Sequence, residues 1–272
     1  MVKVGLCGFR KSGNYLNFRI LKAIMIELGI WNSYNLYSNC WSTFFQPQDL
    51  AFPEELEVDE VLVDERTVIL YKGPHRLRYE TKLLDLNLFN RKSSLVWTHQ
   101  APKKEHFDFF EPDRKWIYVL RDGREVINSF MHFLVTPVLL KRHPEYKIND
   151  VKELYAISGY VEKHIKWWKE DIDAFMRLQD RYLLIRYEDL TSDKSKQIIR
   201  ILDYLGVTTE INLDAILKET SFDSMKKDAP IHVRKGHSKD WKKYFSDQHI
   251  KSFKEIAGKT LIDLGYEKNN DW

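Results

Sequence analysis

The sequence has little of what defines several common protein classes. It holds only 2 cysteines in 272 residues, too few for a disulfide framework, and no metal-site spacing. Its 43 Lys and Arg residues nearly balance its 40 Asp and Glu residues, unlike a basic nucleic-acid-binding protein. No apolar run approaches the roughly 18 residues of a membrane span, and no signal peptide is visible. We therefore expect no nucleic-acid or membrane partner and a cytoplasmic, reducing location.

Residues 3–29 contain the strongest local pattern. Residues 3–9 form a short apolar run that predicts a buried strand, and the apolar spacing from Tyr15 to Gly29 predicts a helix. The basic turn 10–14, Arg-Lys-Ser-Gly-Asn, connects them. A helix N-terminus directs free N–H groups and the positive end of the helix dipole at such a turn. The segment therefore predicts a phosphate-binding loop, although a surface turn that is merely basic would look similar.

The turn is not a standard P-loop. That motif places Lys and then Ser or Thr after its second glycine, where the hydroxyl binds magnesium. Here Lys11 and Ser12 precede Gly13, and Asn14 follows it. The sequence therefore predicts phosphate binding without a metal ligand.

Short apolar strands alternate with helical segments along the rest of the chain. This pattern predicts an α/β fold in which helices flank a central parallel sheet, with residues 1–272 as one domain. Residues 54–65 are acidic and predict a loop-rich insertion, and residues 222–240 predict a loop. The expected further strands are 67–72, 93–99, 115–120 and 181–186, and the expected further helices are 76–89, 122–133, 151–178, 189–205, 211–220 and 246–264.

Four polar residues each follow a predicted strand, namely Lys11, His99, Arg121 and Tyr187. Ligands of such folds bind beyond the carboxyl ends of the strands. We therefore expect these four side chains to line one site.

Three further segments suit an anionic nucleotide. Arg121 and Ser129 could grip one phosphate, although Arg121 could instead pair with Asp122 or Glu125. Residues 232–236 are basic and contain a glycine, which also fits a solvated loop. Residues 220–222 place the Phe222 ring beside two hydroxyls, which suits an adenine, although a phenylalanine is more often a core residue.

Together these segments resemble the cytosolic-type sulfotransferases, which use 3′-phosphoadenosine 5′-phosphosulfate (PAPS). Six motifs of that family have counterparts here in the family's order, spread over nearly the whole chain. In family form they are P-K-S-G-T-T-W, K-T-H-L-P, Y-V-x-R-N-P-x-D-x-x-x-S, R-Y-E-D-L, T-S-F-x-x-M and R-K-G-x-x-x-D-W-K-x-x-F, and here they begin at Arg10, Trp97, Tyr118, Arg186, Thr220 and Arg234.

The resemblance implies a P-loop-like sulfotransferase fold and transfer of a sulfuryl group from PAPS to a hydroxyl or amine of a small molecule, leaving 3′-phosphoadenosine 5′-phosphate (PAP). It implies that His99 is the general base, that Lys11 neutralises the leaving phosphate, and that no metal is needed. The implied cofactor-binding residues are Arg10, Lys11, Ser12, Gly13, Asn14, Tyr15, Leu16, Arg121, Ser129, Tyr187, Thr220, Ser221, Phe222, Arg234, Lys235 and Gly236.

The sequence departs from the family's motifs near the expected site. Leu16 stands where the family has an adenine-stacking Trp, and Trp97 stands where it has a Lys. Two alternatives therefore stay open: a non-catalytic PAP-binding relative, and a kinase acting on a nucleotide or another small molecule. The acceptor and the oligomeric state are not predicted.

Overall fold

The computed structural model describes residues 2–31, 58–64, 67–72, 77–82, 90, 93–110, 112–142, 147–228 and 240–272. The strands are β1 (Val4–Cys7), β2 (Val58–Asp64), β3 (Thr67–Lys72), β4 (Leu77–Lys82), β5 (Leu95–Thr98), β6 (Lys115–Leu120) and β7 (Tyr182–Arg186). The α-helices are α1 (Asn14–Glu27), α4 (Lys104–Phe109), α5 (Gly123–Leu134), α6 (Pro137–Arg142), α7 (Val151–Ala156), α8 (Tyr160–Arg177), α9 (Tyr187–Ser192), α10 (Lys194–Leu205), α11 (Leu213–Glu219), α12 (Phe222–Asp228) and α13 (Asp247–Asp263).

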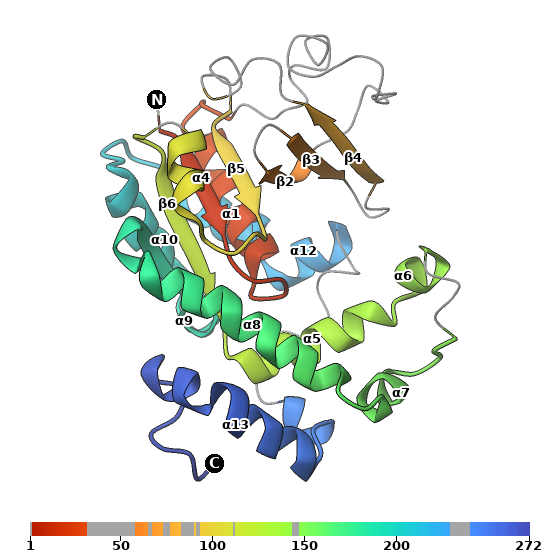
Figure 1. The fold of residues 1–272 in the computed structure, drawn as a ribbon. Coiled ribbons are helices and arrows are strands. Elements are labelled where there is room, and N and C mark those ends of the chain that lie inside the picture. The colour runs from red at the N-terminus through yellow and green to blue at the C-terminus, as the bar shows by residue number, and fades with distance from the viewer. Residues whose placement is uncertain are drawn as a thin grey trace.

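Four parallel strands form the central sheet, in the order β5-β1-β6-β7 (Figure 1). In the register, Cys7 lies between Thr98 and Tyr118, and Leu120 lies beside Arg186. All four strands therefore end at one edge, where His99, Arg121 and Tyr187 follow them. The predicted parallel α/β sheet is confirmed.

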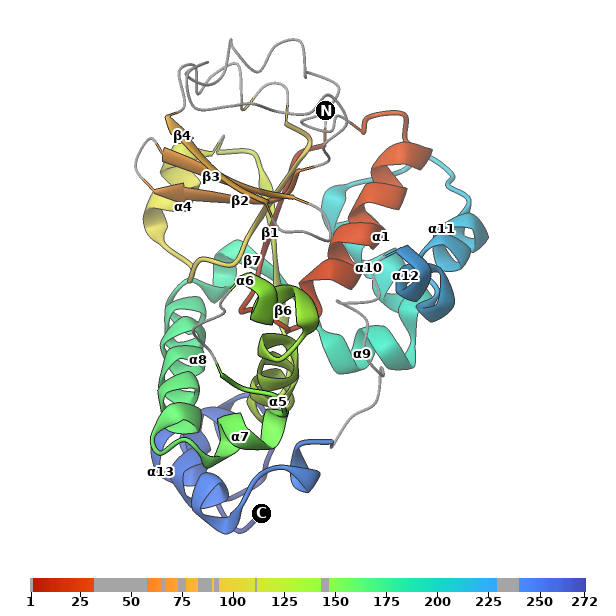
Figure 2. The ribbon, with the colours of Figure 1, turned by 90° about the vertical axis from the view of Figure 1, so that its right-hand side faces the viewer.

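Successive residues of the sheet pack into two different hydrophobic clusters, because side chains alternate between the faces of a strand. Cys7 and Tyr118 pack with apolar side chains of α5, α8 and α13. Leu6 and Val119 pack with side chains of α1, α10 and α11. Figure 2 shows these two sets of helices on opposite sides of the sheet. Because both faces are covered, the strands read as nearly continuous apolar runs, which made them recognisable in the sequence.

A second, antiparallel sheet has the order β2-β3-β4. The expected strand 67–72 is confirmed as β3, but two neighbouring predictions were wrong. Residues 58–64 form a strand within the expected acidic loop, and residues 77–82 form a strand within the expected helix 76–89. The sequence of β4, Leu-Arg-Tyr-Glu-Thr-Lys, alternates with a period of two, which is a strand pattern despite its many charges.

Two long helices were predicted across breaks. The expected helix 151–178 is α7 followed by α8. The break ends at Gly159, which is the N-cap residue of α8 and has a φ of 72°, an angle that favours glycine. The expected helix 189–205 is α9 followed by α10, and the Asp193 carboxylate caps α10 by accepting the N–H of Lys196.

The segment 222–240 was predicted as a loop, but its first part is helix α12. The Ser221 hydroxyl accepts the N–H of Ser224 and so caps this helix. The last predicted helix is confirmed as α13, with Ser246 as its N-cap. Among the described helices, none is both long and apolar enough to cross a membrane.

Candidate active site

The turn between β1 and α1 is tight and has an unusual backbone. Lys11 has a φ of 68° and Gly13 has a φ of 102°, and the Ser12 N–H donates to the Phe9 carbonyl at 3.2 Å. Within the described chain, the α1 N-terminus has no side-chain cap, and its first turn carries no acidic residue. The first N–H groups of a helix lack intrahelical acceptors. This basic turn therefore has the free N–H groups and the positive charge that suit an anion, and phosphate binding by it stays a prediction.

Gly13 is required for close packing as well as for its backbone angle. A Cβ at this position would lie 2.4 Å from Cδ2 of Tyr187. The Tyr187 ring thus lies directly against the turn, where any larger residue would displace it. The structure therefore brings two predicted binding residues that are far apart in the sequence into contact.

Arg121 connects three of the strand ends. Its Nη1 donates to the Lys11 carbonyl at 3.2 Å, and its guanidinium lies 4.3 Å from the centre of the Tyr187 ring. Its Nη2 lies 3.5 Å from Oε2 of Glu125, so the ion pair considered as an alternative does form. Arg121 nevertheless lies at the turn, and its charge adds to those of Arg10 and Lys11.

His99 has a defined tautomer. Its Nδ1 lies 3.0 Å from the Gly8 carbonyl oxygen, which accepts only from a protonated nitrogen. Asn14 donates its amide hydrogens to the carbonyls of Gly8 at 3.0 Å and Phe9 at 2.8 Å, so its 3.2 Å approach to Nδ1 is a contact only. This arrangement leaves Nε2 of His99 with the lone pair, as a general base requires.

The remaining residues of the turn and helix start have varied surroundings. Arg10 stacks on the Trp167 ring at 5.0 Å, and Lys11 lies 4.3 Å from the centre of the Phe133 ring. Ser12 is buried, the Tyr15 hydroxyl accepts from Arg19, and Leu16 is buried in the cluster on the α1 side of the sheet. Their assignment to a nucleotide stays a prediction.

The remaining residues assigned to the adenine and to the 3′-phosphate lie on separate elements. The Thr220 hydroxyl donates to the Ile216 carbonyl, and the Ser221 hydroxyl caps α12. Phe222 is 39% exposed, which fits a ligand-facing ring better than a core residue. Ser129 lies partly buried on α5. Residues 234–236 lie outside the described ranges.

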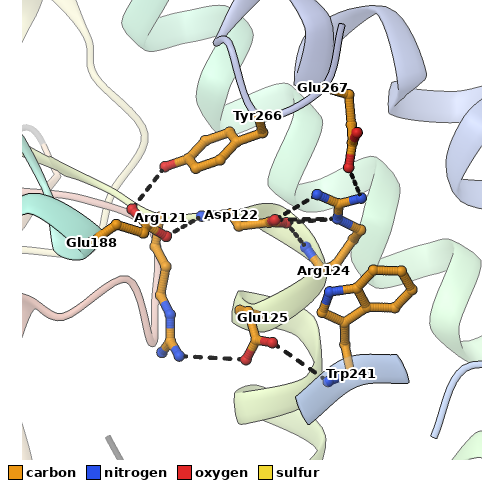
Figure 3. Close-up of polar contacts among 8 residues, drawn as sticks. All are labelled: Arg121, Asp122, Arg124, Glu125, Glu188, Trp241, Tyr266 and Glu267. Atoms are coloured by element: carbon orange, nitrogen blue, oxygen red, sulfur yellow. Dashed lines mark hydrogen bonds and ion pairs between the residues drawn. The ribbon is translucent and has the colours of Figure 1, made fainter. Parts of the chain in front are cut away.

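The turn that carries Arg121 is braced by residues that sequence reasoning missed (Figure 3). The Asp122 N–H and the Tyr266 hydroxyl both donate to Glu188, each at 3.1 Å. Arg124 pairs with Asp122 and Glu267 and stacks on Trp241 and on Trp272. Tyr266, Glu267 and Trp272 lie outside the six motifs, and the partners are up to 143 residues apart, so no local pattern could have identified the network.

Several polar side chains are buried between the central sheet and α8. The Tyr118 hydroxyl donates to Asp171 of α8, and the Cys7 thiol donates to the Gln100 carbonyl at 3.2 Å. Burial raises the pKa of Asp171 to about 7 against the opposing effects of the Tyr118 hydrogen bond and the Arg10 charge. Burial also raises the pKa of Cys7, so this thiol is not an activated nucleophile.

The family model for the sulfotransferase domain matches residues 6–265 of this chain. The chain belongs to the sulfotransferase family. It is 29% identical to human sulfotransferase 2A1 over 179 residues, which cover 58% of this chain and 60% of that protein. It is 26% identical to guinea pig (Cavia porcellus) sulfotransferase 1E1 over 195 residues, which cover 61% of this chain and 63% of that protein. The aligned part thus spans about three fifths of the length of these relatives.

The fold is similar to that of mouse sulfotransferase SULT7A1, whose crystal structure contains PAP. The TM-score is 0.58 at 16% sequence identity, over 97% of this chain and 86% of that one. At this identity the similarity concerns the fold.

The residues present suit an anionic nucleotide. The uncapped helix start and the Arg10, Lys11 and Arg121 cations provide positive charge for an anionic ligand, and Phe222 offers an exposed ring. In the ranges that the structure describes, no group of three or more His, Cys, Asp or Glu side chains could hold a metal ion.

Proposed function

We propose that the protein transfers the sulfuryl group of PAPS to a hydroxyl or amine of a small-molecule acceptor and releases PAP. One observation carries this proposal: the uncapped start of α1, Lys11, Arg121 and His99 lie at the same edge of the parallel sheet. Membership of the sulfotransferase family supports it. When bound, PAPS supplies an activated sulfuryl group.

The basic turn binds and neutralises the 5′ end of the nucleotide in this proposal. The first N–H groups of α1 and the Lys11 ammonium act on the oxygen that gains negative charge as the bond to sulfur breaks. Such preorganised donors stabilise the transition state more than they would in water. Arg121 and Ser129 bind the 3′-phosphate, and Arg121 already reaches the turn through the Lys11 carbonyl.

His99 removes the proton of the acceptor. Its Nδ1–H donates to the Gly8 carbonyl, so Nε2 is the nitrogen that accepts a proton. The same hydrogen bond stabilises the imidazolium that forms, because a carbonyl oxygen accepts better from a charged donor. The acceptor hydroxyl or amine thereby becomes a nucleophile as it attacks sulfur.

Titration calorimetry with PAP, and with ATP plus magnesium as the comparison, tests the nucleotide site. We expect PAP to bind without added metal and more tightly than magnesium-ATP, and we expect Arg121→Ala to weaken PAP binding at least about tenfold. Sulfation of a panel of small phenols, alcohols and amines with labelled PAPS then tests turnover. A preference for magnesium-ATP would support a kinase instead, and PAP binding without turnover of any acceptor would support a non-catalytic relative.

A further inference from the structure

Glu125 is a buried carboxylate next to the candidate nucleotide site, and the proposed reaction gives it no role. It lies on the first turn of α5, and its side chain is only 4% exposed. Its Oε2 lies 3.5 Å from Nη2 of Arg121, and its Oε1 accepts the N–H of Trp241 at 3.4 Å (Figure 3). The carboxylate is therefore fixed at one end and faces the guanidinium with the other.

The Arg121 guanidinium is held on three sides. The Lys11 carbonyl accepts from Nη1, the Tyr187 ring covers one face, and Glu125 lies beside Nη2. The Arg121 side chain is 11% exposed, so it is almost as enclosed as its carboxylate partner. An unrestrained arginine side chain samples many rotamers, and fixing it before a ligand arrives reduces the entropy lost on binding.

Charge explains why Glu125 can hold Arg121 there. Burial raises the pKa of Glu125, and the Arg121 charge and the N–H groups of Trp241 and Asp240 oppose this rise. A buried guanidinium that loses its carboxylate partner is strongly disfavoured where it lies. Without the negative charge of Glu125, Arg121 would turn toward solvent and away from the phosphate-binding turn.

We propose that Glu125 is a positioning residue that holds Arg121 beside the phosphate-binding turn and thereby makes the site select nucleotides with a 3′-phosphate. This inference rests on the proposed function, in which Arg121 binds that phosphate. Glu125 touches no reacting atom and acts through Arg121 alone.

Glu125→Gln tests the role with two nucleotides that differ only in the 3′-phosphate, PAP and AMP, each titrated by calorimetry. Glutamine keeps the length and the oxygen that accepts the Trp241 N–H but removes the charge. We expect the Kd for PAP to rise about tenfold and the Kd for AMP to change less than about twofold. Glu125→Asp keeps the charge on a shorter side chain, so about a threefold loss for PAP is expected. Glu255→Gln, an exposed glutamate on α13, is the matched control and should bind both nucleotides as the wild type does.

A double-mutant cycle separates positioning from a general structural role. In an Arg121→Ala background, Glu125→Gln should cause no further loss of PAP affinity. The inference would be overturned if Glu125→Gln lost affinity for PAP and AMP equally, or if its preference for PAP over AMP stayed the same or increased. It would also be overturned if the losses of PAP affinity were additive in the double variant. If Glu125→Gln does not fold, the PAP-specific loss in Glu125→Asp decides the question. If the wild type binds neither PAP nor AMP, the proposed function is overturned together with this inference. If the wild type binds PAP, and Glu125→Gln still prefers PAP to AMP as strongly as the wild type does, this inference alone is overturned.

Discussion

Replacing Asp171 with asparagine should stabilise the protein, and the gain should be larger at pH 8 than at pH 5. Asp171 lies on α8 with 3% of its surface exposed and accepts a hydrogen bond from the Tyr118 hydroxyl. Burial raises its pKa from 3.8 to about 7. Asparagine has nearly the same shape and can accept the same hydrogen bond, but it never ionises.

The direction of the effect follows from proton binding. Between pH 3.8 and about 7, Asp171 holds a proton in the folded protein and loses it in the unfolded chain. The unfolding free energy of the wild type should therefore be greatest below that range and fall as the pH rises through it. One pKa unit corresponds to about 1.4 kcal/mol, so the full loss is on the order of 4 kcal/mol. At pH 8 we expect the unfolding free energy of the variant to exceed that of the wild type by roughly 2–4 kcal/mol. This difference corresponds to a melting temperature that is higher by about 4–8 °C.

Thermal and urea unfolding of both proteins at pH 5, 6, 7 and 8 would measure this effect. The control is Asp173→Asn, because Asp173 lies on the same helix but is 41% exposed and pairs with Lys169. Its pH dependence should follow that of the wild type. The reasoning would be refuted if the unfolding free energies of the wild type and Asp171→Asn changed with pH in parallel. It would also be refuted if the variant were less stable than the wild type at pH 8.

Three further predictions concern the turn, the base and a helix cap. His99→Ala should lower kcat by roughly 10²–10⁴-fold and leave the Kd for PAP nearly unchanged, and an unaltered kcat would exclude its role as base. Gly13→Ala should destabilise the protein by about 1–3 kcal/mol and weaken PAP binding, because its Cβ would overlap Tyr187. The control is Gly29→Ala, where φ is also positive but no atom lies within 4 Å, so denaturant unfolding should show a smaller loss and calorimetry no change in PAP affinity. Ser246→Ala should cost about 1 kcal/mol and lower the melting temperature by about 2–4 °C, measured by thermal unfolding.

The sequence predicted the parts of the fold in which local pattern and burial agree. The strand 115–120 was predicted with the bounds it has in the structure, because a strand covered on both faces is a continuous apolar run. The strand 77–82 was missed because half of its residues are charged, although it pairs antiparallel with the neighbouring strand 67–72, with Lys72 opposite Leu77. Helix breaks were missed at residues 157–159 and 193, because the apolar spacing continues across them.

The candidate site was predictable in composition and not in contacts. The four polar residues at strand ends do meet at one edge, as parallel connections require. Tyr187 was expected among the cofactor-binding residues, but its packing on Gly13 and on the Arg121 guanidinium was not predicted. Contacts of this kind depend on strand order and register, which no short motif encodes.

Residues that follow the matched sulfotransferase domain contact the network around the Arg121 turn. The family match ends at residue 265, yet Tyr266 and Glu267 reach back to Glu188 and Arg124 around that turn. Arg124 is 6% exposed at its side chain, so both of its carboxylate partners contribute to an almost enclosed charge cluster. Buried ion pairs stabilise little on their own, but removing one partner leaves the other charge without compensation. The residues after the family match therefore keep this turn in place, and with it the arginine on which recognition of a 3′-phosphate would depend.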